Sequence, residues 1–264
     1  MAELAGRAAI VTGAGAGIGR AIGQALAAQG AFVWVTDADA AGAAETAAGI
    51  EQAGGRAEAV RLDVSEEAAW EAALSRCDAA TDALTVLVNC AGTARVTDTF
   101  SMPLADFRRI MSVNVEGTFL GMKHAIPRIA DNGGGAVVNI SSIAGLKGMA
   151  RWTAYCGSKG AIRMMTKAVA LECAQLRNGV RVNSVHPGFV DTPSLRAAIA
   201  GGHRADPARG SVPADLDEVA KTAVPIGVAC SPDEVAATVC FLASAGARHI
   251  TGAEIVVDGG MTAG

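Results

Sequence analysis

Seven short apolar segments alternate with longer, alanine-rich segments along the 264 residues of the chain. The short segments are rich in β-branched residues and almost continuously apolar, as are strands that are buried on both faces of a sheet. The intervening segments are long enough to form the helical crossovers that join parallel strands. The alternation therefore predicts an α/β fold, with a doubly wound, parallel, seven-stranded sheet and helices on both faces. We expect strands at 8–12, 31–36, 57–62, 84–89, 135–141, 180–186 and 254–258.

The sequence contains no linker, repeat or low-complexity tract, and we expect residues 1–264 to form a single domain. One irregular region, 189–230, is interrupted by prolines and glycines and has only short helical stretches. Long loops in compact domains are often functional. Because the strand pattern resumes after this region, we interpret it as a lid over a substrate site.

Charge and composition exclude several classes of protein. The net charge is −4 and the chain has no basic block, which argues against a nucleic-acid partner. The apolar runs are too short to cross a membrane, and the N-terminus lacks a signal-peptide pattern. The six cysteines form no C-x-x-C pair and the four histidines have no ligand spacing. We therefore expect a cytoplasmic protein with reduced thiols and no metal site.

The first predicted strand runs into a glycine-rich turn, "VTGAGAGIGRAIGQAL", which opens a helix. Glycines let main-chain N–H groups approach a pyrophosphate, and the helix N-terminus adds partial positive charge. A turn between a strand and a helix is the context that a dinucleotide site requires. The alternative is a tight turn with a structural role alone. The turn residues expected to bind a cofactor are Gly13, Gly15, Gly17, Ile18 and Gly19.

Two acidic residues follow predicted strands. Asp37 ends the second strand, where its carboxylate can accept hydrogen bonds from both hydroxyls of an adenosine ribose and repel a 2′-phosphate. Neighbouring Ala16 and Ala38 offer no cation to such a phosphate, although a solvated acid at a turn is the alternative. Asp63, beside Val64, either meets an adenine amino group or caps the helix expected near residue 66.

Tyr155 is the only tyrosine of the chain, and Lys159, one of five lysines, stands four positions further on. Residues at this spacing share one face of a helix. A phenol has an ordinary pKa near 10, which a cation one turn away lowers. The spacing by itself leaves the role of the pair open, because a lone tyrosine with a lysine nearby is also found in ordinary cores.

Several of these motifs stand together in one order: "TGAGAGIG", Asp37, "NCAG" at 89–92, Asn114, "NISS" at 139–142, "YCGSK" at 155–159 and "HPGFVDT" at 186–192. In this the sequence resembles the short-chain dehydrogenase/reductase family over nearly its whole length. The resemblance implies a Rossmann-like domain, a bound nicotinamide dinucleotide and hydride transfer at a carbinol or carbonyl carbon. Cys90 departs from the family pattern, which has a second asparagine there.

The resemblance also implies roles for individual residues. Tyr155 becomes the general acid/base, and Lys159 lowers its pKa and binds the nicotinamide ribose. Ser142 holds the substrate oxygen, and Asn114 holds a water that joins Lys159 to solvent. Taken singly, Ser142 and Asn114 could instead cap or end helices. The further cofactor contacts implied are Asn89, Ala91, Gly92, Pro187, Gly188, Val190 and Thr192.

A substrate pocket is expected around Ala144, Met149 and Trp152, which could equally be helix-entry packing. Within the family, the resemblance favours an NAD(H)-dependent enzyme that interconverts a cyclic or aryl-alkyl secondary alcohol and its ketone. The alternatives are a hydroxysteroid dehydrogenase and a non-catalytic NAD-binding regulator. A β-ketoacyl-carrier-protein reductase is disfavoured by Asp37 and the negative charge. We also expect a homotetramer, and a segment 193–225 that becomes ordered when NAD and substrate bind.

Overall fold

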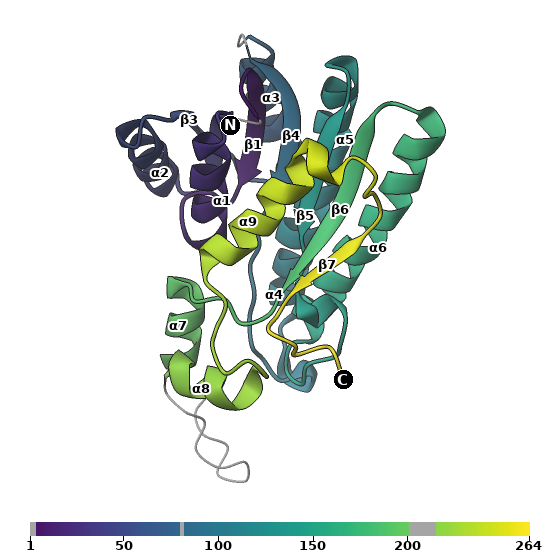
Figure 1. Cartoon of the computed structure of the whole chain (residues 1–264). Coiled ribbons are helices and arrows are strands. Elements are labelled where there is room, and N and C mark those ends of the chain that lie inside the picture. Colours follow the sequence, from purple (N-terminus) through teal and green to yellow (C-terminus); the bar gives the residue numbers. More distant parts are fainter. Residues whose placement is uncertain (1–3, 80–81, 201–214) are drawn as a thin grey trace.

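The computed structural model describes residues 4–79, 82–200 and 215–264. These residues form a parallel seven-stranded sheet in the order β3-β2-β1-β4-β5-β6-β7 (Figure 1). All seven predicted strands are confirmed, each end to within one residue. Their bounds are β1 (Arg7–Thr12), β2 (Phe32–Asp37), β3 (Arg56–Arg61), β4 (Ala83–Asn89), β5 (Gly135–Ile140), β6 (Val180–Pro187) and β7 (Glu254–Val257).

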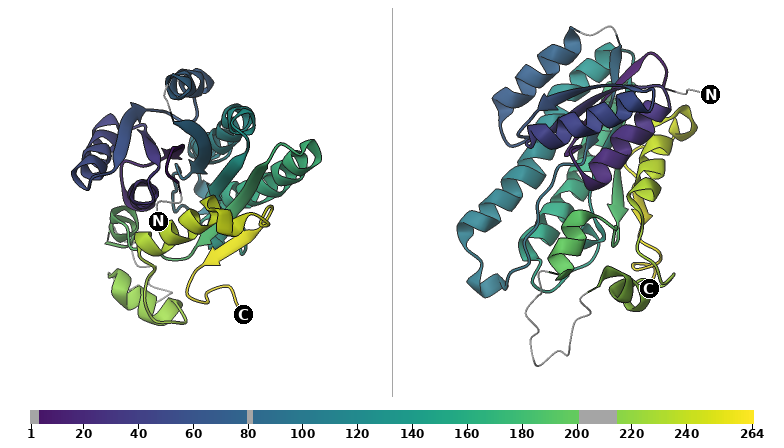
Figure 2. Two further views of the ribbon diagram at one scale, coloured as in Figure 1. Left: turned by 45° about the horizontal axis from the view of Figure 1, so that its top comes forward. Right: turned by 90° about the vertical axis from the view of Figure 1, so that its left-hand side faces the viewer.

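Helices cover both faces of this sheet, as the alternating sequence pattern predicts (Figure 2). One apolar cluster packs α1, α2 and α9 against one face, and a second packs α3, α5 and α6 against the other. The helices are α1 (Gly17–Ala28), α2 (Ala40–Gln52), α3 (Glu67–Asp78), α4 (Leu104–Met111), α5 (Gly117–Asp131), α6 (Thr153–Leu176), α7 (Pro193–Ala200), α8 (Leu216–Ala223) and α9 (Pro232–Ala243). The fold is the expected Rossmann-like one.

The strand order reverses between β1 and β4, because the chain first builds outward to β3 and then crosses to the other side. In open parallel sheets, ligands bind beyond the carboxyl ends of the strands at such a switch point. Two short turns lie at this edge of the sheet: a π-helical turn η2 (Ser112–Glu116) between α4 and α5, and a 3₁₀ turn η3 (Ile143–Gly145) after β5. The topology therefore specifies where a site should be sought.

The predicted lid, 189–230, contains α7 and α8, which Arg196 joins through ion pairs to Asp191, Asp215 and Asp217. Residues 201–214 of this region lie outside the described residues, so the predicted ordering of 193–225 stays a prediction. All six cysteines are free thiols. Across the described ranges, no helix is long and apolar enough to cross a membrane, and no cluster of three or more His, Cys, Asp or Glu could hold a metal.

Candidate active site

The carboxyl ends of β1, β2, β4, β5 and β6 open into one cavity of about 1070 Å³. Ligand sites commonly measure about 300–1000 Å³, so this cavity is large enough for an extended ligand. The predicted residues Gly15, Asn89, Asn114 and Ala144 do not line it. The predicted residues that do line it are Gly13, Gly17, Ile18, Gly19, Asp37, Asp63, Val64, Ala91, Gly92, Ser142, Met149, Trp152, Tyr155, Lys159, Pro187, Gly188, Val190 and Thr192.

The glycine turn between β1 and α1 can hold only glycine at two positions. Gly13 has a φ of +65°, and a Cβ there would lie 2.7 Å from the Cα of Ala91. A Cβ on Gly19 would overlap the carbonyl of Gly13. The helix begins after Ala16, whose side chain makes no capping bond, and its first turn carries no acidic residue. The first N–H groups of α1 therefore face the cavity. Because the glycines beside them carry no side chains, a pyrophosphate can approach these N–H groups closely.

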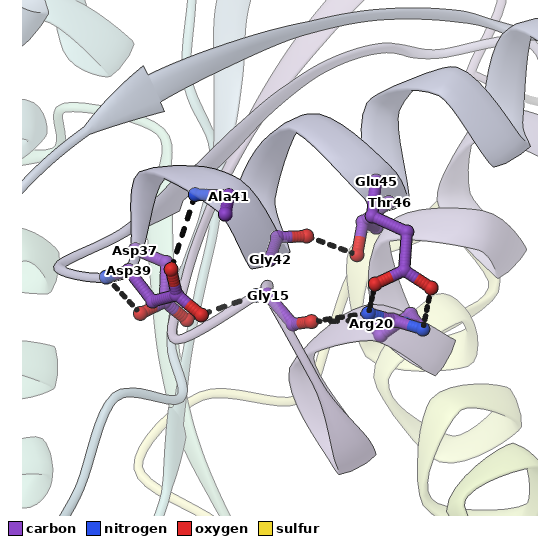
Figure 3. A network of polar contacts seen from close by, with 8 residues as sticks. All are labelled: Gly15, Arg20, Asp37, Asp39, Ala41, Gly42, Glu45 and Thr46. Atoms are coloured by element: carbon purple, nitrogen blue, oxygen red, sulfur yellow. Dashed lines mark hydrogen bonds and ion pairs between the residues drawn. The ribbon is translucent and has the colours of Figure 1, made fainter.

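Gly15 does not line the cavity, and both its N–H and its carbonyl are hydrogen-bonded to side chains (Figure 3). Its N–H donates to Oδ2 of Asp37 at 2.9 Å. Its carbonyl accepts from Nε and Nη2 of Arg20 at 3.2 and 2.6 Å. Arg20 in turn makes a bidentate ion pair with Glu45 of α2. The strand-end carboxylate and the turn are thus linked to each other and to the second helix.

Asp37 keeps one carboxylate face toward the cavity while its oxygens accept two main-chain N–H groups. Besides Gly15, Asp39 donates its N–H to Oδ1 at 2.9 Å. Asp63 is held similarly, because its Oδ1 accepts the N–H and the hydroxyl of Ser65. These bonds lower the pKa of Asp63. Asp63 does not cap α3, whose N-cap is Glu66, so of the two sequence interpretations the cavity position is the one that the structure favours.

The turn after β4 is held by its main chain. The hydroxyl of Thr12 accepts the N–H groups of both Cys90 and Ala91 at 3.0 Å. This explains how a cysteine can replace the second asparagine of the family motif. The side chain of Asn89 points into the core instead, where its amide donates to Oδ1 of Asn139 at 2.9 Å. Asn89 therefore joins β4 to β5, and its predicted contact with a cofactor stays a prediction.

Ser142, Tyr155 and Lys159 come together although thirteen residues separate the serine from the tyrosine. Ser142 stands after β5, and the other two lie on the first turns of α6. Nζ of Lys159 lies 5.6 Å from the centre of the Tyr155 ring and donates to the carbonyl of Ile140 at 2.8 Å. The Trp152 ring packs on Tyr155, with ring centres 5.5 Å apart. The helical spacing of Tyr155 and Lys159 was thus correctly read from the sequence.

Burial acts on both titratable groups of this cluster. It raises the pKa of Tyr155, while a hydrogen bond with Ser142 lowers that pKa by a smaller amount. Burial also lowers the pKa of Lys159 to about 8. Desolvation disfavours the charged form of each group, which is the physical cause of both shifts. The lowering of the Tyr155 pKa by Lys159 that the helical spacing suggests stays a prediction.

Asn114 and Ala144 lie one layer behind the cavity. Asn114 is fully buried in the π-helical turn, where its amide donates to Thr93 and Ser158 and its Oδ1 accepts the N–H of Thr93. Its water-holding role stays a prediction. Ala144 donates its N–H to the hydroxyl of Ser142 at 3.1 Å, and its predicted place in a substrate pocket stays a prediction. The serine caps η3 and lines the cavity at once, so the two sequence interpretations of Ser142 do not exclude each other.

The segment after β6 closes the opposite side. Gly188 continues the sheet by donating its N–H to the carbonyl of Val257, and a Cβ on it would lie 2.9 Å from the Cα of Asp258. A Cβ on Gly17 would lie 3.4 Å from the methyl group of Thr192, so this segment reaches across to the glycine turn. The hydroxyl of Thr192 accepts the N–H of Leu195 at the start of α7.

A family model described as enoyl-(acyl carrier protein) reductase matches residues 13–262. A solved short-chain type dehydrogenase/reductase from Mycobacterium marinum superposes with a TM-score of 0.89 at 31% identity, covering 100% of this chain and 98% of the other. This chain belongs to the short-chain dehydrogenase/reductase family. It is an oxidoreductase of a family that uses a nicotinamide cofactor.

Three curated relatives from the short-chain dehydrogenase/reductase family differ in what their names say they act on. The cis-4-hydroxycyclohexanecarboxylate dehydrogenase of Sinomonas cyclohexanicum is 38% identical, covering 97% of each chain. The 3-alpha-(or 20-beta)-hydroxysteroid dehydrogenase of Mycobacterium bovis is 37% identical, over 99% of this chain and 92% of that one. The NADP-dependent (R)-specific alcohol dehydrogenase of Lentilactobacillus kefiri is 36% identical, over 99% and 98%.

Sequence reasoning missed part of the wall of this short-chain dehydrogenase/reductase cavity. The missed residues come from the loop after β4, from α4 and its π-helical turn, from η3, from the segment after β6 and from the start of α7. Apart from Phe189, which lies in the motif at 186–192, they belong to none of the quoted motifs, and loop residues reach a cavity only through the fold. They include Thr93, Ala94, Val96, Arg109, Ser112, Val113, Ile143, Phe189, Ser194 and Leu195.

Proposed function

We propose that the protein interconverts a cyclic or aryl-alkyl secondary alcohol and its ketone, with NAD(H) as the hydride carrier. The observation that carries the proposal is that Ser142, Tyr155 and Lys159 line the same cavity as Asp37 and the glycine turn. A group that can transfer a proton and a site that can bind a dinucleotide therefore lie in one cavity. A bound nicotinamide supplies the hydride acceptor or donor.

Three side chains are proposed to carry out the steps other than hydride transfer. Tyr155 accepts the hydroxyl proton in the direction of oxidation and returns it in the direction of reduction. Ser142, which lines the same cavity as Tyr155 and lowers its pKa, holds the substrate oxygen and stabilises negative charge that develops on it. Lys159 places a positive charge beside the Tyr155 ring and favours the phenolate. The roles of these three residues are part of the proposal.

The cofactor proposal rests on the fit of the cavity to an unphosphorylated ribose. Asp37 lines the cavity at the end of β2, next to Ala38 and opposite Ala16. A carboxylate accepts hydrogen bonds from ribose hydroxyls and repels a 2′-phosphate, and neither alanine supplies a cation. The nearest cation in the network of Figure 3, Arg20, is already bound by Glu45 and by the Gly15 carbonyl. NAD(H) is therefore favoured, although one relative is NADP-dependent by name.

The substrate proposal rests on the apolar side chains of the cavity wall. Met149 and Trp152, at the entry to α6, are joined there by Val96, Phe189 and Leu195. Such a wall suits a ring-shaped, uncharged substrate. The large cavity and the hydroxysteroid relative favour a second candidate, a hydroxysteroid dehydrogenase of the same chemistry. The non-catalytic regulator is disfavoured, because Ser142, Tyr155 and Lys159 are all present and line one cavity.

We also propose a homotetramer, as large apolar side chains are exposed on two separate faces. Phe119 of α5 and Met164 and Leu171 of α6 form one face, and Phe241 of α9 and Val256 of β7 form another. Exposed apolar patches mark contact surfaces. Two self-complementary surfaces on one chain build a closed tetramer.

The test is turnover with NAD on a panel of cyclic alcohols, aryl-alkyl alcohols and steroid alcohols, with Tyr155→Phe as the matched variant. Tyr155→Phe keeps the ring that packs on Trp152 and removes the proton-transfer group. We expect kcat to fall by about 10²–10⁴ and the affinity for NADH to be retained. Highest kcat/KM on a steroid would favour the second candidate. Near-normal turnover by Tyr155→Phe would contradict the mechanism, and NADH binding without turnover of any alcohol would support the regulator.

A further inference from the structure

The catalytic serine stands at the point where β5 leaves the sheet. The ladder between β5 and β6 ends with the pair Ile140 and Val185. Ser141 extends it by one bond, because its N–H donates to the Val185 carbonyl at 2.8 Å. Ser142 follows with an extended backbone and turns into η3. The ladder itself makes no bond to the peptide group that leads out of Ser142.

A histidine side chain provides the bond that the ladder lacks. His186, the next residue of β6, is fully buried, and its Nδ1 lies 3.1 Å from the carbonyl oxygen of Ser142. Its Nε2 lies 2.8 Å from the hydroxyl of Ser184. The same carbonyl accepts the N–H of Gly145, which closes η3. The carbonyl of Ser142 is therefore held from the sheet side and from the turn side.

The partners of the imidazole determine its tautomer. A carbonyl can only accept, so Nδ1 carries the proton that bonds the Ser142 carbonyl. The Ser184 hydroxyl lies 2.8 Å from Nε2 and 3.3 Å from the carbonyl of Ala253, and its one proton can go to either. Burial lowers the pKa of His186, with Arg163 and Lys159 acting in the same direction and the Ser142 bond and Glu254 opposing them. The ring is thus neutral at physiological pH. A neutral ring protonated on Nδ1 serves as a fixed donor to the Ser142 carbonyl.

We propose that His186 is a positioning residue that sets the direction of the Ser142 hydroxyl toward Tyr155. This rests on the proposed function of Ser142. The Ser142 hydroxyl accepts the N–H of Ala144 at 3.1 Å, and Ser142 lines the same cavity as Tyr155, whose pKa it lowers. Rotation of the Ser142 peptide would carry the hydroxyl away from both partners. The Nδ1–H of His186 opposes that rotation, so the effect of His186 on turnover passes through Ser142.

The first test compares two variants of His186. His186→Phe keeps a buried ring and removes the donor, whereas His186→Asn keeps an N–H donor close to the place of Nδ1. For His186→Phe we expect kcat to fall roughly 10–100-fold, as displaced catalytic groups do, with the Kd of NADH within about twofold of the wild type. His186→Asn should recover most of the loss. Wild-type kcat in His186→Phe, or equal losses in the two variants, would overturn the proposal.

The second test separates positioning from a general effect on the fold. His186→Phe is combined with Ser142→Ala and kcat is compared across the four proteins. If the histidine acts through the serine, His186→Phe lowers kcat in the wild type and has no further effect in Ser142→Ala. An equal fold-loss in both backgrounds would show that the histidine supports the fold alone, and would overturn the proposal.

The third test measures no turnover and reads the result from the wild-type protein itself. Nitrogen-15 NMR of the histidine rings in the wild-type protein reports tautomer and charge, and His186→Asn identifies the His186 signal by its loss. We expect a neutral ring protonated on Nδ1. A ring protonated on Nε2, or a cationic ring at neutral pH, would overturn the proposal. If the wild type turned over no alcohol, the proposed function would be refuted. The spectrum would still show whether His186 is the neutral, Nδ1-protonated donor that the proposal requires.

Discussion

Asp37 is the residue on which the proposed preference for NAD rests. Its oxygens accept the N–H groups of Gly15 and Asp39, so the carboxylate is held in place at the end of β2. A 2′-phosphate brought to this position would meet a fixed negative charge, at a cost of about 1–4 kcal/mol per unit charge at 4 Å. The cofactor preference should therefore depend on this residue.

For Asp37→Ala we predict that the ratio of kcat/KM with NAD to kcat/KM with NADP falls by about 10-fold or more, because the repulsion and the ribose bonds disappear together. The matched control is Asp39→Ala. Asp39 carries the same charge two residues on but caps α2 through the N–H of Ala41, so its loss costs about 1 kcal/mol of stability and keeps the preference. A wild type that uses NADP at least as well as NAD would contradict the cofactor proposal.

The pH profile of alcohol oxidation should report the balance of effects on Tyr155. Oxidation needs the phenolate, and burial raises the pKa of the phenol whereas the hydrogen bond with Ser142 lowers it. In Ser142→Ala the lowering effect is lost, so the rising limb of kcat against pH should move to higher pH. Reduction, which needs the protonated phenol, should keep its rate to higher pH in the same variant. An unmoved or downward-shifted limb would contradict the role of Ser142.

Among the elements, α1 and α2 meet through a single polar network behind the glycine turn. Arg20 of α1 binds both Glu45 of α2 and the carbonyl of Gly15 (Figure 3). The side chains of Arg20 and Glu45 are 31% and 70% exposed, so the ion pair itself contributes little to stability. We expect Arg20 to matter instead for the conformation of the glycine turn, because it donates a hydrogen bond to the Gly15 carbonyl.

We predict that Arg20→Met raises the KM for NAD several-fold while kcat and the melting temperature change little, because the turn loses a restraint but the core keeps its packing. The control is Arg56→Met, which breaks the ion pair with Asp82 away from the cavity and should leave KM unaltered. Equal KM values in both variants and the wild type would show that the turn needs no such restraint.

At the scale of the whole molecule, the two exposed apolar faces predict the assembly. Leu171 on α6 is 66% exposed and Phe241 on α9 is 48% exposed, on opposite layers of the sheet. We predict a tetramer mass by light scattering at micromolar concentration. A charge at either position, Leu171→Glu or Phe241→Glu, should yield a dimer, because one of the two contact types remains. A charge on α2's exposed C-cap, Ala53→Glu, is the control. A monomeric wild type would contradict the proposal.

The sequence alone determined much of this protein because the relevant information is local. Strand positions follow from short, β-branched, almost continuously apolar runs and helix positions from the longer alanine-rich segments between them, and the seven strands lie where this pattern predicts them. The glycine turn between β1 and α1 and the spacing of Tyr155 and Lys159 are also local patterns. Each places its residues on one short element, so no knowledge of the fold was needed to relate them.

Only the tertiary structure decided which polar side chains turn toward the cavity and which turn away. Asn89 and Asn114 stand in the same motifs as cavity residues, yet each binds a partner from another element: Asn139 on β5, and Ser158 on α6. His186 reaches Ser142 across a strand pair, 44 residues away. A buried polar group must find a hydrogen-bond partner, and that partner is brought close by the packing of distant segments, which no local pattern encodes.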